Sequence, residues 1–358
     1  MDFSSSGASR FFLGANTRRG FVSYYDDFPG FSGEDFLWVI KGGPGCGKSS
    51  FMKRIGAAAE AAGMPVEYIH CSGDPDSLDA VYLPLQHVAY ADGTAPHVIE
   101  AVYPGAASLY LDLGSFLDAD ALKPHLEEIA ALNREYKALY AGAYAQLSAA
   151  AALLPSALPG CVPPEASARL ERRLAGLVSR ELHALHKEGR LRHRLLSANS
   201  CQGRITLYDT LRSGGYRLVT LDNRLGLGHR FLSGLTEQAL ARGYEVILCH
   251  DPLEPELPEA VLLPEAGLAL LAADRPLPPE LEIYRHLRLD ALAGTPDAAL
   301  RTLLRRRKKE SDLLLNAAFD TLARAKVLHD RLEAVYHPHV DFAGSAALSE
   351  DHIHWLFG

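Results

Sequence analysis

A glycine-rich octapeptide, Gly42 to Ser49, has the residue types and the spacing of a phosphate-binding loop. Its sequence, GGPGCGKS, fits the pattern G-x-x-x-x-G-K-[ST] at every fixed position. Glycines let backbone N–H groups close around phosphate oxygens, and a following helix adds the positive end of its dipole. Lys48 is expected to reach the β- and γ-phosphates, and the Ser49 hydroxyl to ligate Mg²⁺. The residues expected to bind the nucleotide are Gly43, Pro44, Gly45, Cys46, Gly47, Lys48, Ser49 and Ser50.

The segments on either side of the octapeptide predict the strand–loop–helix context that such a site requires. Residues 36–40 (FLWVI) form a short apolar run that is typical of a buried strand. After the octapeptide, apolar residues recur at helical spacing until Gly63, which is expected to end the helix. An ordinary glycine-rich turn is the alternative, but this context favours a nucleoside triphosphate site. The apolar residues at helical spacing are Phe51, Met52, Ile55, Ala58, Ala59 and Ala62.

A second segment, residues 87–92, has the pattern of a strand that ends in an acid, Asp92. This is the usual form of a Walker B element, in which the carboxylate orients water on Mg²⁺. Ser49 and Asp92 are therefore the expected metal ligands. Asp92-Gly93 is also a common hairpin signal, so a simple turn at the end of the strand is the alternative.

No glutamate follows Asp92, so a water-activating group has to come from elsewhere. Asp74 is the predicted proton acceptor, because it follows a strand expected over residues 66–71 and ligands bind at the carboxyl ends of parallel strands. A solvated, capped turn is an equally good interpretation of this acidic segment. The further candidates are Asp76, Asp79, His97 and Glu100.

An internal repeat determines the fold prediction. Residues 63–84 align without gaps to residues 243–264, 180 positions later, and eight of the 22 positions are identical. Chance gives roughly one or two identities at ordinary amino-acid usage. The segment ANTRRG at 15–20 also recurs as ANSCQG at 198–203. The predicted fold class is α/β: tandem duplicated P-loop NTPase-like units, each a parallel sheet flanked by helices and followed by a helical appendage.

The length of 358 residues predicts two domains. The first, residues 1–190, combines the nucleotide-binding unit with a helical hairpin over about 117–190. The second, residues 191–358, is a degenerate repeat with a long helical segment over 297–336. If the repeat is structural, His70 superposes on His250.

The second copy lacks the residues that bind phosphate. In the corresponding segment, 222–230 (DNRLGLGHR), either His229 or Gly228 falls opposite Lys48, and neither alignment keeps a hydroxyl after it. Two bulky leucines crowd a cradle that needs bare backbone. This half is therefore expected to be structural or regulatory. Arg224 and Arg230 are alternative candidates for presenting a positive charge to the first-half nucleotide.

Composition limits the partners and the compartment. A net charge of −8 argues against a general nucleic-acid coat, and the basic run at 305–309 is expected to be a solvated helix face. Five widely spread cysteines without a C-x-x-C pair suit a reducing cytoplasm. The Ala/Leu-rich stretch ending at 147–154 is too weakly apolar to span a bilayer. We expect a cytoplasmic protein without membrane or nucleic-acid partners, whose helical segments offer the surface for any protein partner.

Four groups of residues carry a resemblance to a known family: Arg10-Phe11-Phe12 with Gly14, Asn16-Thr17 and Gly20; Lys41 to Ser49; His70-Cys71-Ser72 with Asp74; and Asp92-Gly93-Thr94-Ala95-Pro96-His97. Together they resemble an uncharacterised family of bacterial tandem-repeat P-loop ATPases, closely in the first half and loosely in the second. The resemblance implies ATP binding and ATPase activity, with no established substrate. Members of that family carry a good loop in both halves, and this chain departs from them in the second.

The expected function is Mg²⁺-dependent binding and slow hydrolysis of ATP at the first-half site. Lys48 holds the phosphates, while Ser49 and Asp92 organise the metal. One alternative is a small-molecule or nucleotide kinase in which Asp74 accepts the proton of an acceptor hydroxyl. Another is a non-catalytic nucleotide switch whose helical arms engage a partner. The sequence does not choose among the three.

Overall fold

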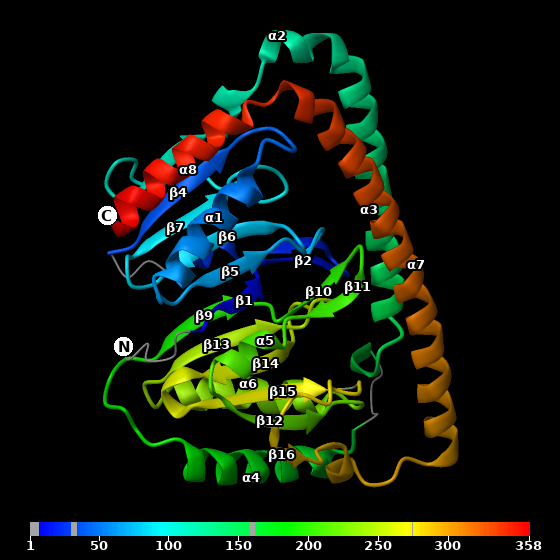
Figure 1. Ribbon diagram of the computed structural model, residues 1–358. Helices are drawn as coiled ribbons and strands as arrows, with labels where there is room; N and C mark the ends of the chain where they lie inside the picture. Colours follow the sequence, from blue (N-terminus) through cyan, green and yellow to red (C-terminus); the bar gives the residue numbers. More distant parts are fainter. Residues whose placement is uncertain (1–6, 30–33, 158–161, 274) are drawn as a thin grey trace.

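The chain folds into two α/β units that share one plan (Figure 1). Each unit has a mixed, mostly parallel sheet of six strands flanked by helices. The structure, a computed structural model, describes residues 7–29, 34–157, 162–273 and 275–358. Among these residues no helix is both long enough and apolar enough to cross a membrane.

The first sheet has the strand order β1-β5-β6-β7-β4-β8. Strand β6 is antiparallel to both of its neighbours, and the other pairings are parallel. A hairpin of β2 and β3 follows β1 directly in the chain. The strands are β1 (Ser9–Phe12), β2 (Gly14–Thr17), β3 (Gly20–Ser23), β4 (Phe36–Lys41), β5 (Glu67–His70), β6 (Leu78–Leu83), β7 (Val88–Asp92) and β8 (Ser108–Asp112).

The second sheet repeats this order as β9-β13-β14-β15-β12-β16, with β14 antiparallel to both neighbours. A hairpin of β10 and β11 follows β9 directly in the chain. The strands are β9 (Arg190–Arg194), β10 (Ser197–Ser200), β11 (Gly203–Thr206), β12 (Arg217–Asp222), β13 (Glu245–His250), β14 (Pro258–Leu263), β15 (Leu268–Ala273) and β16 (Ile283–Leu287).

The pairing register of the two sheets repeats at the interval found in the sequence. Ile69 pairs with Ala80 in the first sheet, and Cys249 pairs with Ala260 in the second, 180 positions later on both strands. Both pairings then shift register at the next residue, so that His70 and His250 occupy the same irregular position. The expected equivalence of the two histidines is therefore confirmed.

The two sheets pack face to face, and the short helix α5 (Asp209–Ser213) contributes Leu211 to the apolar layer between them. One hydrophobic cluster lies between the inner faces. It includes Ala80 and Ala91 of the first sheet and Ala260 and Leu271 of the second. Separate clusters lie outside each sheet. Helices α1 (Lys48–Ala61) and α8 (Phe342–Phe357) cover the first, and α6 (Leu227–Leu240) and α4 (Pro164–Glu181) cover the second. Burial on both sides explains why all six residues of β6 and all six of β14 are buried.

Reciprocal hydrogen bonds mark a pseudo-twofold axis between the units. The backbone N–H of Phe12 donates to Leu195 O, and that of Leu195 donates to Phe12 O, both at 2.9 Å. Four residues later in each unit, Asn16 Nδ2 donates to Asn199 O and Asn199 Nδ2 donates to Asn16 O, again both at 2.9 Å. The sequence repeat is thus arranged as an internal pseudo-dimer.

The helical appendages cross from one unit to the other. Helix α3 (Leu126–Ala151) of the first unit runs antiparallel along α7 (Ala298–Tyr336) of the second (Figure 1). After α3 the chain continues into α4, which packs on α6 of the second unit, and after α7 it continues into α8, which packs on α1 of the first. The sequence interpretation had placed α4 in a hairpin of the first half. Two short helices complete the set, α2 (Ala119–Leu122) and α5 (Asp209–Ser213).

One buried ion-pair group lies at the seam between the units. Arg194 is fully buried, and its guanidinium lies 2.7 Å from Glu67 Oε1, while Arg192 lies 2.9 Å from Glu67 Oε2. Arg192 also pairs with Glu245 at 3.3 Å. Burial by itself raises the pKa of Glu67, but the two guanidinium groups outweigh it and hold that pKa below its ordinary value.

Replacing Glu67 is expected to destabilise the chain strongly. Glu67→Gln leaves the buried Arg194 without its carboxylate, and breaking a buried pair from one side costs about 3–5 kcal/mol. Urea unfolding followed by circular dichroism measures the effect, with the exposed Glu171→Gln on α4 as control. An equal midpoint for the two variants would show that the pair does not hold the seam.

The same pair predicts a pH dependence. Because the pKa of Glu67 is lower in the folded chain than in the unfolded one, its stabilisation is present above the unfolded pKa and lost as the pH falls. The difference in melting temperature between wild type and Glu67→Gln is expected to be constant from pH 8 to pH 5 and to shrink below about pH 4. A melting series across this range measures it, and a difference that grows on acidification contradicts the assignment.

Candidate functional site

The glycine-rich loop (residues 42–47) joins β4 to α1, as the sequence predicts. Gly45 and Gly47 have φ angles of +67° and +91°, a left-handed conformation that favours glycine. Gly47 is also the N-cap of α1, so the first backbone N–H groups of that helix open toward the loop. The loop therefore has the glycine geometry and the helix start that an anion requires.

Lys48 is the first residue of α1, and its side chain folds back onto this loop. Its Nζ donates to Gly42 O at 3.2 Å and to Gly43 O at 3.0 Å, and it lies 3.6 Å from Asp92 Oδ2. The two side chains are only 12% and 16% exposed. The pairing of β4 with β7 positions the acid, because it places Asp92 beside Ile40, two residues before the loop.

The carboxylate of Asp92 is oriented by its own turn. Its Oδ1 accepts from the backbone N–H of Thr94 at 2.8 Å and from the Thr94 hydroxyl at 2.6 Å. The other oxygen is the one that faces Lys48. Asp92 therefore ends a strand and begins a short loop, and its fixed carboxylate faces the cation of the glycine-rich loop.

Ser49 is the second residue of α1, next to Lys48. Its Oγ accepts a hydrogen bond from the backbone N–H of Leu78 at 2.9 Å. A hydroxyl oxygen has two lone pairs, so one remains for a cation. The hydroxyl of Ser49 and the carboxylate of Asp92 are oxygen donors of the kind that Mg²⁺ takes, so these residues fit the metal. Ser50 is exposed.

Asp74, the predicted proton acceptor, has other partners. Its Oδ2 accepts from the Ser77 hydroxyl at 2.9 Å and lies 3.4 Å from Lys326 Nζ on α7. The neighbouring Asp76 accepts from Gln202 Nε2 at 2.9 Å. These acids form a turn that contacts α7 and the second unit, whereas the lysine of the loop pairs with Asp92.

A buried His–Asp pair lies at the same edge of the first sheet. Nε2 of His97 is 3.0 Å from Asp79 Oδ2, and both side chains are buried. The rings of Phe21 and Tyr25 pack against the imidazole, at 5.1 Å and 4.8 Å between ring centres. Burial lowers the pKa of His97, but the carboxylate of Asp79 outweighs it and raises that pKa above its ordinary value. Glu100, another candidate, pairs instead with Lys41 at 2.9 Å.

The second unit supplies a cover for the glycine-rich loop. A Cβ placed on Gly45 would lie 2.9 Å from the ring of His337 and 3.1 Å from Cβ of Glu333. One placed on Gly43 would lie 3.1 Å from the ring of Tyr336. These residues belong to the end of α7 and the following short 3-10 helix η7 (His337–His339). Sequence reasoning missed them, because nothing local links residues almost 300 positions apart.

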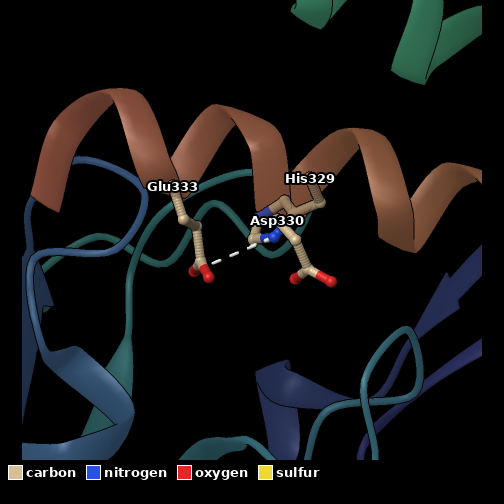
Figure 2. Close-up of side chains that lie close together, drawn as sticks. All are labelled: His329, Asp330 and Glu333. Carbon is tan, nitrogen blue, oxygen red and sulfur yellow. Dashed lines mark ion pairs between the residues drawn. The ribbon is translucent and has the colours of Figure 1, made fainter.

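Glu333 belongs to a group of charged residues on α7. Figure 2 shows His329, Asp330 and Glu333, with an ion pair of 3.8 Å between His329 Nδ1 and Glu333 Oε1. The three residues offer ligand atoms within 4.8 Å of one another. Asp330 also pairs with Lys326, which in turn reaches Asp74. Lys326 therefore links Asp330 of this group to Asp74 of the first unit.

The corresponding loop of the second unit is built differently. Ile40 and Leu221 are equivalent in the sheets, and Phe51 and Phe231 are the equivalent buried residues of the helices, so the second loop is one residue shorter. In this register, Gly228 stands opposite Lys48, His229 opposite Ser49, and Ala272 opposite Asp92.

The two arginines proposed to reach the first-half nucleotide contact their own half. Arg224 pairs with Asp290 at 3.4 Å, and Arg230 donates to the Ser167 hydroxyl on α4 at 3.0 Å. These contacts give no support to the suggestion that either arginine serves the first site.

Comparisons with protein-family models, curated proteins and solved structures find no match to this chain. The chemistry of the site therefore has to be argued from its own residues.

The cover over the loop predicts the outcome of a glycine substitution. Gly45→Ala adds backbone strain of about 1–2 kcal/mol and a clash with His337. Gly63→Ala is the matched control, because Gly63 also has a positive φ but nothing lies within 4 Å of its Cβ position. We expect Gly45→Ala to lower the melting temperature more than Gly63→Ala does. Adding His337→Ala should remove most of that excess, and no recovery would mean that α7 does not press on the loop.

Proposed function

We propose that the first-half site binds MgATP and hydrolyses it slowly, in a cytoplasmic P-loop NTPase. The observation that carries this proposal is the position of Lys48, whose Nζ lies within the glycine-rich loop and 3.6 Å from Asp92. A lysine held by loop carbonyls exchanges them readily for phosphate oxygens, because a triphosphate is the stronger partner.

Each part of the site has a separate task in this proposal. Backbone N–H groups between Gly43 and Lys48, with the start of α1, hold the phosphates. Ser49 and Asp92 hold Mg²⁺, which offsets charge on the phosphate oxygens. The Thr94 hydrogen bonds keep the carboxylate of Asp92 in place, so it needs no reorganisation when the nucleotide binds.

Hydrolysis is proposed to be slow because the acids that the sequence offers as water-activating groups, Asp74, Asp76, Asp79 and Glu100, all have other partners. The pair of Asp79 and His97 is buried, and its members contact each other at 3.0 Å. Asp74, the alternative, is paired with Lys326. A kinase that uses Asp74 as proton acceptor has to break this ion pair first, so the structure offers it no specific support.

A nucleotide-dependent switch is the second candidate, and one observation favours it. Glu333, Tyr336 and His337 of the second unit press on the glycine-rich loop. A nucleotide that changes the conformation of this loop changes the contact with the end of α7, and α7 runs the length of the helical arm (Figure 1). In that function the paired helices α3 and α7 are the surface that meets a protein partner.

Lys48→Ala is expected to weaken MgATP binding by well over tenfold, because the triphosphate loses its buried cationic ligand. Lys53→Ala is the matched control, since Lys53 lies one turn further along α1 with an exposed side chain. Isothermal titration calorimetry on both variants measures the effect, after thermal melts confirm that both fold. Unchanged MgATP affinity in a folded Lys48→Ala chain would refute the site.

Turnover assays on the same samples separate the two candidate functions. Phosphate release by wild type, lost in Lys48→Ala and kept in Lys53→Ala, supports the ATPase. Tight MgATP binding without phosphate release, together with a change in proteolysis of the η7 segment, supports the switch.

A further inference from the structure

The second unit contains a large pocket at the sheet edge where the first unit has its glycine-rich loop. The pocket has a volume of about 840 Å³, within the usual range for small-molecule sites. It lies at the carboxyl ends of β12 and β15 and extends to the first turns of α7. The segment that follows α3, residues 153–156, lines one side, so both units line this pocket.

The pocket does not reproduce a triphosphate cradle, because the chain itself fills that space. Asn223 Oδ1 accepts from the backbone N–H of His229 at 3.2 Å, and a Cβ on Gly228 would lie 2.9 Å from the same oxygen. His229 Nδ1 lies 2.7 Å from Pro258 O and therefore carries the proton, so its Nε2 accepts from Asn223 Nδ2 at 2.7 Å. The start of α6 is thus capped internally, and the open volume lies beside it.

Cationic side chains line two walls of this open volume. One wall is a face of α7, where Arg301, Arg305 and Lys308 recur at helical spacing. The other wall is the loop after β12, where the side chain of Arg224 is 82% exposed although it pairs with Asp290 at 3.4 Å. The cationic residues that line these walls and the rim are Arg204, Arg224, Arg275, Arg288, Arg301, Arg305 and Lys308. Carboxylates line the same pocket, but each has a partner of its own: Asp251 and Glu259 pair with Arg204, Asp290 with Arg224, Asp312 with Lys308 and Asp222 with His286, and Glu254 accepts from the Ser156 hydroxyl.

Apolar side chains line the pocket between these walls. Leu304 and Leu315 come from the same face of α7, Leu153 and Leu154 from the segment after α3, and Leu225 from the short loop. An apolar surface with cations at its border suits a ligand with a ring-sized apolar body and a compact anionic group. Guanidinium groups bind phosphate through paired hydrogen bonds, which favours phosphate as that group.

We propose that this pocket binds an organic phosphate, with the phosphate held between Arg224 and the Arg301–Arg305 face of α7 and the apolar body against the leucines. This is a second ligand site, independent of MgATP at the first. It also gives part of the basic run at 305–309 a task, because Arg305 lines the pocket, whereas Arg306 and Lys308 form ion pairs along α7 with Glu310 at 3.7 Å and Asp312 at 3.1 Å.

Binding is measured by calorimetry with AMP, UMP and pyridoxal 5′-phosphate as probes, in the Lys48→Ala chain so that the first site does not contribute. At least one probe is expected to bind ten times more tightly than its dephosphorylated parent and than inorganic phosphate. Because no step requires a working first site, failure of the proposed ATPase leaves this result unaffected.

Charge removal at the pocket supplies the second measurement. Arg305→Ala and Arg224→Ala are each expected to weaken the best probe about tenfold, because each removes one charged hydrogen-bond donor. Arg306→Ala, the adjacent arginine that does not line the pocket, is the matched control and should bind normally. Equal affinity in all three variants, no probe tighter than its parent, or citrate tighter than every phosphate would overturn the proposal.

Discussion

The face-to-face packing of the two sheets is the constraint on which the rest of the molecule depends. Inner-face residues such as Ala80 and Ala260 are buried only because the other sheet covers them, and small side chains there let the sheets approach closely. The buried group around Glu67 and Arg194 fixes the seam, since a charge at that depth is tolerated only with its partner in place. Neither unit therefore has a complete apolar core without the other.

The pseudo-twofold relation then explains why each site is built from both halves. Once the reciprocal bonds of Asn16 and Asn199 fix the axis, the two helical arms have to run antiparallel past each other. The end of α7 reaches the glycine-rich loop of the first unit, and the segment after α3 reaches the pocket of the second. Helix α7 thus contacts both sites, with Arg301 near one end and Glu333 near the other.

The sequence predicted what is encoded locally. The strand–loop–helix around Lys48, the strand ending at Asp92 and the helix beginning near residue 297 all follow from short-range periodicity and caps. The repeat also predicted the register, because identities 180 positions apart imply one pairing pattern. The exchange of α4 and α8 was not predictable in this way. An amphipathic helix indicates that it has a partner, but its periodicity does not identify which surface that partner is.

The two loops differ at the positions of Lys48 and Asp92, and these two differences are linked because the residues form an ion pair. In the first unit the charges of the partly buried Lys48 and Asp92 neutralise each other. Losing either residue alone would leave an unpaired charge at the sheet edge. The second unit has glycine and alanine at the two positions, and the pair is absent as a whole. His229 replaces Ser49 and donates to the backbone carbonyl of Pro258, whereas Ser49 accepts from the backbone N–H of the equivalent Leu78. In both units, therefore, this helix position bonds the backbone at the start of the central antiparallel strand, but only the first unit has the cation–carboxylate pair. The structural role of the loop is thus separate from its ability to bind a ligand.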